Sequence, residues 1–134
     1  MAAKEANGDI SALAQTVKLC GDGLTIYSGN DDQITAFMSL GAKGVVSVLS
    51  NIAPRAVHDM VKMYLDGDTA ASTELQLKYL DLCSSLFSDV NPIPVKEAMN
   101  MMGMEVGSCR LPLAQIQPQA KEKLRRSLST FGMI

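Results

Sequence analysis

The first 67 residues alternate strand-like apolar runs with helical periodicity, whereas residues 68–134 contain helical periodicity alone. Runs typical of β-strands occupy residues 24–28 and 44–49, and apolar residues at helical spacing occupy residues 10–20, 34–40 and 54–66. The run at 44–49 is β-branched and continuous, which is typical of a parallel strand covered on both faces. Strands that alternate with helices predict an α/β fold with a parallel sheet.

Residues that favour helix starts and ends define the remaining elements. Asp9 and Asp68 are good N-caps, and Pro54 suits the first position of a helix. Three amphipathic helices are predicted in the second half, at residues 68–88, at 94–102 and from Pro118 onward. We therefore divide the chain into an α/β part, residues 1–67, and a helical part, residues 68–134, which we expect to pack directly on each other.

Charge and the few cysteine and histidine residues exclude several classes of function. Twelve basic and 14 acidic residues give a net charge of -2, which argues against a nucleic-acid or membrane-surface partner. One histidine and three scattered cysteines predict reduced thiols and neither a zinc site nor a Ser-His triad. No apolar run reaches the roughly 20 residues of a membrane span, and residues 1–8 lack signal-peptide features. A cytoplasmic protein is expected.

Five segments, in order along the chain, resemble one family. They are Lys4-Glu5-Ala6-Asn7-Gly8-Asp9, Tyr27-Ser28-Gly29-Asn30-Asp31-Asp32, Gly41-Ala42-Lys43-Gly44-Val45-Val46-Ser47-Val48, Asn91-Pro92-Ile93-Pro94-Val95-Lys96 and Arg110-Leu111-Pro112-Leu113. Together they resemble the C-terminal portion of the dihydrodipicolinate synthase family, in the class I pyruvate-dependent aldolase superfamily. The resemblance implies the last three units of a (β/α)8 barrel, beginning inside the sixth strand, followed by a three-helix C-terminal extension.

Lys4 is the position with the largest consequence for function. An arbitrary lysine is a solvated surface charge. In the family that this chain resembles, the lysine of the Lys-Glu-Ala motif, here Lys4, forms a Schiff base with pyruvate. The covalent imine therefore replaces a separate cofactor. A primary amine is required because only it converts the ketone into an iminium, and the amine must be neutral to react, which burial favours.

Four further positions are candidate binding residues by the same resemblance. Val46 matches a position that holds pyruvate through its backbone and aliphatic side chain, while also being expected as a buried strand residue. Gly29, Asn30 and Asp31 match the segment that contacts the second substrate. Without the resemblance, these residues are expected to form only the N-cap of the helix that begins near residue 34.

The resemblance implies a Schiff-base condensation of pyruvate with L-aspartate semialdehyde, in lysine and diaminopimelate biosynthesis. Because the first five strands of the family's barrel have no counterpart here, the isolated chain is expected to be inactive. Its expected partners are pyruvate, an aldehyde co-substrate, and either further copies of itself, as in the family's homotetramers, or a complementary N-terminal half-barrel. The alternatives are an inactive remnant with a structural or interaction role, and a related pyruvate aldolase such as N-acetylneuraminate lyase.

Overall fold

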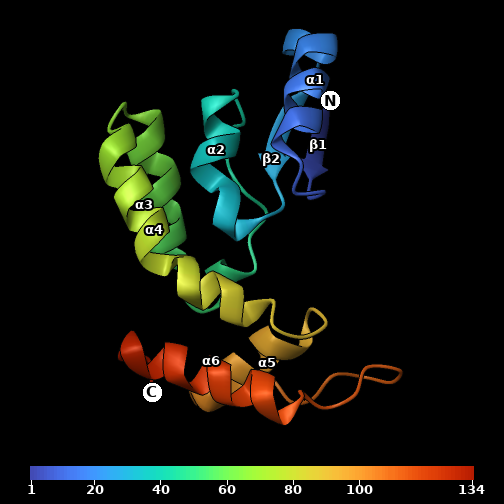
Figure 1. The fold of residues 1–134 in the computed structure, drawn as a ribbon, viewed down its shortest axis with the longest axis vertical. Coiled ribbons are helices and arrows are strands. Elements are labelled where there is room, and N and C mark those ends of the chain that lie inside the picture. Colours follow the sequence, from blue (N-terminus) through green and yellow to red (C-terminus); the bar gives the residue numbers. More distant parts are fainter.

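A computed structural model describes residues 1–134, and it contains a small parallel sheet and six α-helices. In chain order the elements are β1 (Ala2–Glu5), α1 (Ile10–Cys20), β2 (Thr25–Ser28), α2 (Ile34–Ser39), α3 (Pro54–Leu65), α4 (Thr69–Leu86), α5 (Ile93–Met101) and α6 (Pro118–Thr130). Figure 1 shows an elongated molecule with the sheet toward one end and α5 and α6 together at the other. The predicted α/β class is confirmed in this form, and no strand follows residue 67.

The sheet is smaller than the sequence predicts. β1 and β2 pair in parallel, with Lys4 opposite Tyr27. The predicted strand at 44–49 contributes only one parallel bridge, between Ser28 and Val45, and its prediction as a full strand is wrong. The segment leaves the sheet because the N–H groups of Val48 and Leu49 donate to a side-chain carboxylate, described below, and not to a neighbouring strand.

Most helix starts follow the predicted signals. The carboxylate of Asp9 accepts hydrogen bonds from the N–H groups of Ser11 and Ala12, and Asp68 accepts one from Ala71. These bonds satisfy N–H groups that a helix leaves free at its first turn. Pro54, which has no N–H to leave unpaired, is the first residue of α3.

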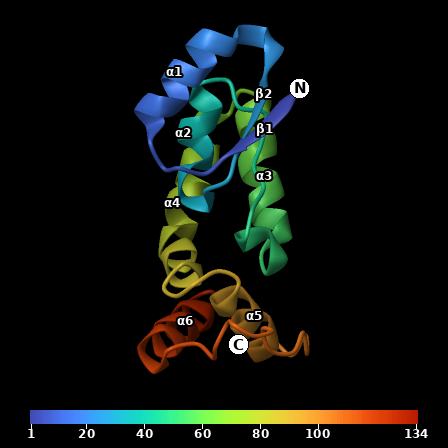
Figure 2. The ribbon, with the colours of Figure 1, turned by 90° about the vertical axis from the view of Figure 1, so that its right-hand side faces the viewer.

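The helical second half packs directly on the first half, as predicted. α3 and α4 lie side by side, which Figures 1 and 2 show from two directions. One apolar cluster extends from α2 through α3 and α4 to α5 and α6, with Met60, Leu82 and Leu128 fully buried in it. A smaller cluster around Leu13 and Phe37 joins α1 to α2. The boundary at residue 67 stays a prediction.

Two apolar residues of the periodic segments 10–20 and 54–66 lie at the surface. Leu65, at the last turn of α3, is 57% exposed, and Cys20, at the last turn of α1, is also exposed. Both are at helix ends, where the helix extends beyond the elements that cover its middle. No helix in the structure is both long enough and apolar enough to cross a membrane.

Candidate active site

The candidate lysine, Lys4, lies near the C-terminal end of β1. It is exposed, and its ammonium takes part in none of the chain's ion pairs, which all lie in residues 58–126. The peptide on its C-terminal side is held by the sheet, because the carbonyl of Glu5 accepts a 2.7 Å hydrogen bond from the N–H of Gly29. The backbone that carries Lys4 is therefore fixed, while its side chain stays accessible.

Gly29 lies directly against the Lys4 side chain. A methyl group placed on Gly29 would lie 2.9 Å from the Cε of Lys4, 2.5 Å from the Cβ of Ala6 and 3.1 Å from the carbonyl oxygen of Glu5. Each of these distances is shorter than an ordinary van der Waals contact. Glycine is therefore required at position 29 so that the end of β2 can approach the lysine.

The substitution Gly29→Ala is expected to lower the free energy of unfolding by about 1–3 kcal/mol, the usual cost of overpacking. Ala6 and Glu5 would obstruct the new methyl group with a Cβ and a backbone oxygen, which cannot rotate away. Urea denaturation measures the change. Gly23→Ala is the matched control, since a methyl group there meets no atom within 4 Å. Equal stabilities of the two variants would contradict the close approach of β2 to Lys4.

Val46 is attached to the same sheet end through its backbone. Its N–H donates to the carbonyl of Ser28 at 2.7 Å, next to Gly29. Its side chain, however, is 49% exposed, so the prediction of a buried strand residue is wrong. The physical reason is that the segment ends the sheet and has no further strand to cover it.

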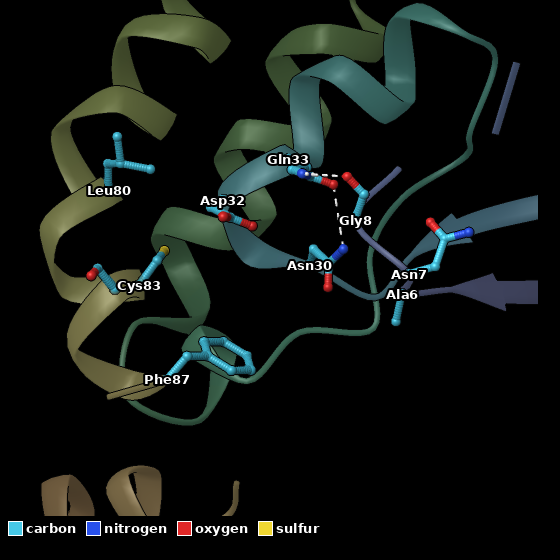
Figure 3. Close-up of a pocket in the computed structure, with 10 residues that line it drawn as sticks. Ala6, Asn7, Gly8, Asn30, Asp32, Gln33, Leu80, Cys83 and Phe87 are labelled. Atoms are coloured by element: carbon cyan, nitrogen blue, oxygen red, sulfur yellow. Dashed lines mark hydrogen bonds between the residues drawn. The ribbon is translucent and has the colours of Figure 1, made fainter. Parts of the chain in front are cut away.

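Asn30 belongs to a chain of hydrogen bonds between amide groups near the C-terminal ends of β1 and β2. Its Nδ2 donates to the Oε1 of Gln33 at 3.3 Å, and the Nε2 of Gln33 donates to the carbonyl of Gly8 at 3.2 Å (Figure 3). These bonds join the loop after β2 to the loop after β1. They line a cleft of about 460 Å³, whose opposite wall is formed by Leu80, Cys83, Ser84 and Phe87.

Asp31 points away from this cleft into the protein, and is only 1% exposed. Its Oδ2 accepts hydrogen bonds of 2.9 Å from the N–H groups of both Val48 and Leu49, while its Oδ1 has no partner. The prediction that Asp31 caps its own helix is therefore wrong. Its carboxylate instead caps the 3-10 turn Leu49–Asn51, 18 residues further along the chain.

The thiol of Cys83 is a buried titratable group beside this carboxylate. Burial, with smaller contributions from the negative charges of Asp31 and Asp32, raises the pKa of Cys83 to about 12. A neutral thiol of this kind is a poor nucleophile and metal ligand. The structure also has no group of three or more His, Cys, Asp or Glu side chains placed to hold a metal ion.

The structure thus brings some predicted residues together and separates others. Lys4 and Gly29 are in contact, Val46 is bonded to the residue before Gly29, and Asn30 faces the cleft. Asp31 performs a buried structural role. Sequence reasoning missed Gln33 and Gln76, although a glutamine four residues after Ser72, on the buried face of α4, was a signal that could have been followed.

Candidate residues at the carboxyl ends of parallel strands, with helices between the strands, define an α/β protein whose site lies on that side of its sheet. Comparison with known proteins specifies the family. The sequence model of the dihydrodipicolinate synthetase family matches residues 1–131. The chain belongs to this family.

Individual relatives agree with this assignment. The chain is 49% identical over 134 residues to a 4-hydroxy-tetrahydrodipicolinate synthase of Clostridium perfringens, and 50% identical over 134 residues to one of Lachnoclostridium phytofermentans. Both alignments cover all of this chain and 46% of the relative. The crystal structure of dihydrodipicolinate synthase from Aquifex aeolicus matches 99% of this chain with a TM-score of 0.94 at 37% identity, and 45% of that chain is covered. A pyruvate complex of the Acinetobacter baumannii enzyme matches 98% of this chain and 45% of its own, with a TM-score of 0.91 at 35% identity. The chain therefore spans less than half the length of these relatives.

Proposed function

We propose that this chain supplies the Schiff-base lysine and part of the substrate pocket for condensation of pyruvate with L-aspartate semialdehyde. The observation that supports this most is the contact between Lys4 and Gly29, in a chain whose family is known. Relatives of the chain are named 4-hydroxy-tetrahydrodipicolinate synthase. The proposed setting is lysine biosynthesis in the cytoplasm.

The proposed reaction begins at the Nζ of Lys4. As a neutral amine it attacks C2 of pyruvate, the carbonyl oxygen leaves as water, and a C=N iminium forms. The iminium draws electrons from the adjacent methyl group, which loses a proton and becomes an enamine. The enamine carbon then bonds to the aldehyde carbon of the second substrate, whose oxygen takes up a proton. No separate cofactor is needed, since the lysine–pyruvate imine is the electron sink.

A complementary half-barrel is the partner that this mechanism requires. Imine formation needs a desolvated amine and enamine formation needs a proton acceptor, whereas Lys4 is exposed in this chain. We propose that the chain forms the last three units and the C-terminal extension of a (β/α)8 barrel, and that the first five units cover Lys4. Assembly into homo-oligomers, as is implied for the family, is proposed as well.

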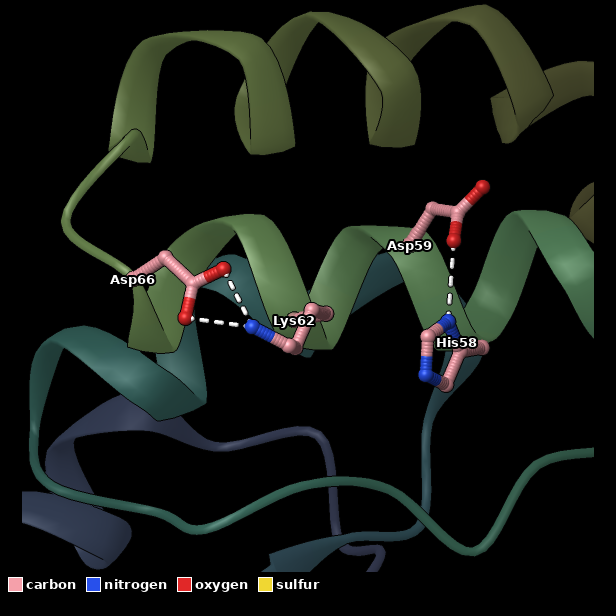
Figure 4. Close-up of polar contacts among 4 residues, drawn as sticks. All are labelled: His58, Asp59, Lys62 and Asp66. Carbon is pink, nitrogen blue, oxygen red and sulfur yellow. Dashed lines mark hydrogen bonds and ion pairs between the residues drawn. The ribbon is translucent and has the colours of Figure 1, made fainter.

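The open edge of the sheet supports the proposal of a complementary half-barrel. The N–H and C=O of Val45 make no hydrogen bond within the chain, so they are free to pair with another strand. Beside this edge is a groove of about 400 Å³, lined by Tyr27, Gly44, Val45, Val57, His58, Val61, Lys62 and Leu65. On the α3 side of the groove, His58 contacts Asp59 and Lys62 contacts Asp66 (Figure 4). Leu65, at the end of the groove, is 57% exposed.

The proposal is tested by measuring turnover with and without a complementary half. The chain would be mixed with the N-terminal portion of the Clostridium perfringens relative, and consumption of pyruvate with L-aspartate semialdehyde would be followed. We expect turnover from the mixture and negligible turnover from either part alone. Lys4→Ala in the mixture is the control and should abolish turnover. A folded mixture without turnover would favour the alternative, a structural subunit with no catalysis.

A further inference from the structure

Gln76, on α4, holds the loop that follows β2. Its side chain is only 7% exposed, and its amide is bonded both to that loop and to the first turn of α2. The Nε2 donates to the carbonyl of Asp32 at 2.7 Å, and the Oε1 accepts from the N–H of Thr35 at 2.7 Å. One side chain thus satisfies a free N–H at the start of α2 and fixes the turn that carries Asn30 and Asp31.

The same loop holds the segment that carries Val46. The carboxylate of Asp31, one residue before the carbonyl that Gln76 binds, accepts the N–H groups of Val48 and Leu49 at 2.9 Å. The bonds therefore run from α4 through the loop after β2 to the residues just beyond Val46. Apart from the Oδ1 of Asp31, which has no partner, the polar groups of this network are bonded, and each bond restricts the groups that make the next.

A second buried polar residue on α4 makes a different contact. The hydroxyl of Ser72 is fully buried and donates to the carbonyl of Met60 on α3 at 2.7 Å. Ser72 lies one turn before Gln76 on the same face of the helix, yet its bond leads to another helix and not to the candidate site. Both residues are buried and bonded to backbone groups, but Gln76 makes two bonds near the candidate site and Ser72 makes one bond to α3.

We propose that Gln76 is a positioning residue through which α4 sets the geometry of the candidate site, at Asn30, at Asp31 and, through Asp31, at the Val46 segment. The helical second half of the chain then has a direct part in the site and does not merely cover the sheet. The consequence for chemistry at Lys4 rests on the proposed function. The consequence for the geometry of the loop does not.

The test compares Gln76→Met with Ser72→Ala in the 134-residue chain by amide hydrogen exchange. Methionine keeps the length of the side chain and removes both hydrogen bonds. We expect exchange at Thr35, Val48 and Leu49 to accelerate by about tenfold or more, beyond any change at core amides such as that of Leu128. Ser72→Ala should change all amides uniformly, in proportion to the loss of global stability.

Thr35 reports the direct bond to Gln76, and Val48 and Leu49 report the transmitted effect. Acceleration at Thr35 alone, or the same uniform change in both variants, would overturn the proposal. Should Gln76→Met fail to fold, Gln76→Glu replaces it, since glutamate keeps the acceptor for Thr35 and loses the donor to Asp32. In that variant Thr35 keeps its acceptor and its exchange should change little, whereas exchange at Val48 and Leu49 should accelerate. Unchanged exchange at Val48 and Leu49 would overturn the proposal.

A second arm measures pyruvate labelling of Lys4 by borohydride in the mixture with the complementary half. We expect Gln76→Met to slow labelling relative to Ser72→Ala. If the unsubstituted chain is not labelled, the proposed function fails, and the exchange experiment still decides the role of Gln76. Labelling of the unsubstituted chain with equal rates in the two variants would limit Gln76 to a structural role.

Discussion

Replacing Asp31 with alanine is expected to lower the free energy of unfolding by about 2–4 kcal/mol, because two N–H groups lose a charged acceptor at once. Leu49 is fully buried and Val48 is half-buried, so neither N–H can readily turn to water. A buried donor without a partner costs more than the hydrogen bond itself contributes. Chemical denaturation of the 134-residue chain measures the loss.

The neighbouring residue provides a matched control for this variant. Asp32 has the same side chain, is exposed, and its carboxylate makes no hydrogen bond in the structure. Asp32→Ala should therefore change the free energy of unfolding by no more than about 0.5 kcal/mol. Equal losses in the two variants would contradict the role assigned to the Asp31 carboxylate.

The helices could be predicted from sequence because their signals are local. Each signal acts within the first turn of its own helix. The carboxylates of Asp9 and Asp68 accept N–H groups two or three residues further on, and Pro54 is the first residue of α3. Apolar spacing at residues 54–66 and from Pro118 onward also predicted α3 and α6, because periodicity of 3.6 residues identifies one side of a helix. In the structure these helices bury Met60 and Leu128.

The sheet could not be predicted to the same extent, because its outcome depends on contacts between distant residues. The β-branched run at 44–49 has strand propensity, yet the carboxylate of Asp31 takes the N–H groups of Val48 and Leu49 away from any ladder. Val46 is exposed because no further strand covers the segment that carries it, and this too depends on residues distant in sequence. Neither feature can be predicted from the residues that adjoin it in the sequence.

The resemblance named candidate residues, and it did not give their arrangement. The resemblance named Lys4 and Gly29 through their motifs, but only the structure places them in contact. It also named Asn30 and Asp31 together, although adjacent residues on a turn point in opposite directions, one to the cleft and one to the interior. Gln76 reaches Asp32 across 44 residues of sequence, which no motif records.

Two accounts of the chain differ in what they expect of Lys4. In the first, Lys4 is the reactive amine of a pyruvate-dependent enzyme, completed by a complementary half-barrel. In the second, the chain keeps the family's fold as a structural or interaction subunit, and Lys4 is one exposed lysine among others. The first account expects selective reaction with pyruvate, and the second expects none.

Borohydride reduction in the presence of pyruvate, followed by peptide mass mapping, tests the central claim most directly. Only an imine is converted into a stable secondary amine, so the label marks the lysine that reacted. Lys4→Arg is the control, because it keeps the positive charge and lacks a primary amine. The measurement is made on the chain alone and on its mixture with the complementary half.

We expect the label on Lys4 and on no other lysine of this chain, slowly in the chain alone and at least about tenfold faster in the mixture, where the amine is desolvated. Lys4→Arg should remove the label entirely. Label distributed evenly over Lys4, Lys18, Lys62 and Lys78 in the mixture would contradict the account, because it would make Lys4 an ordinary exposed lysine.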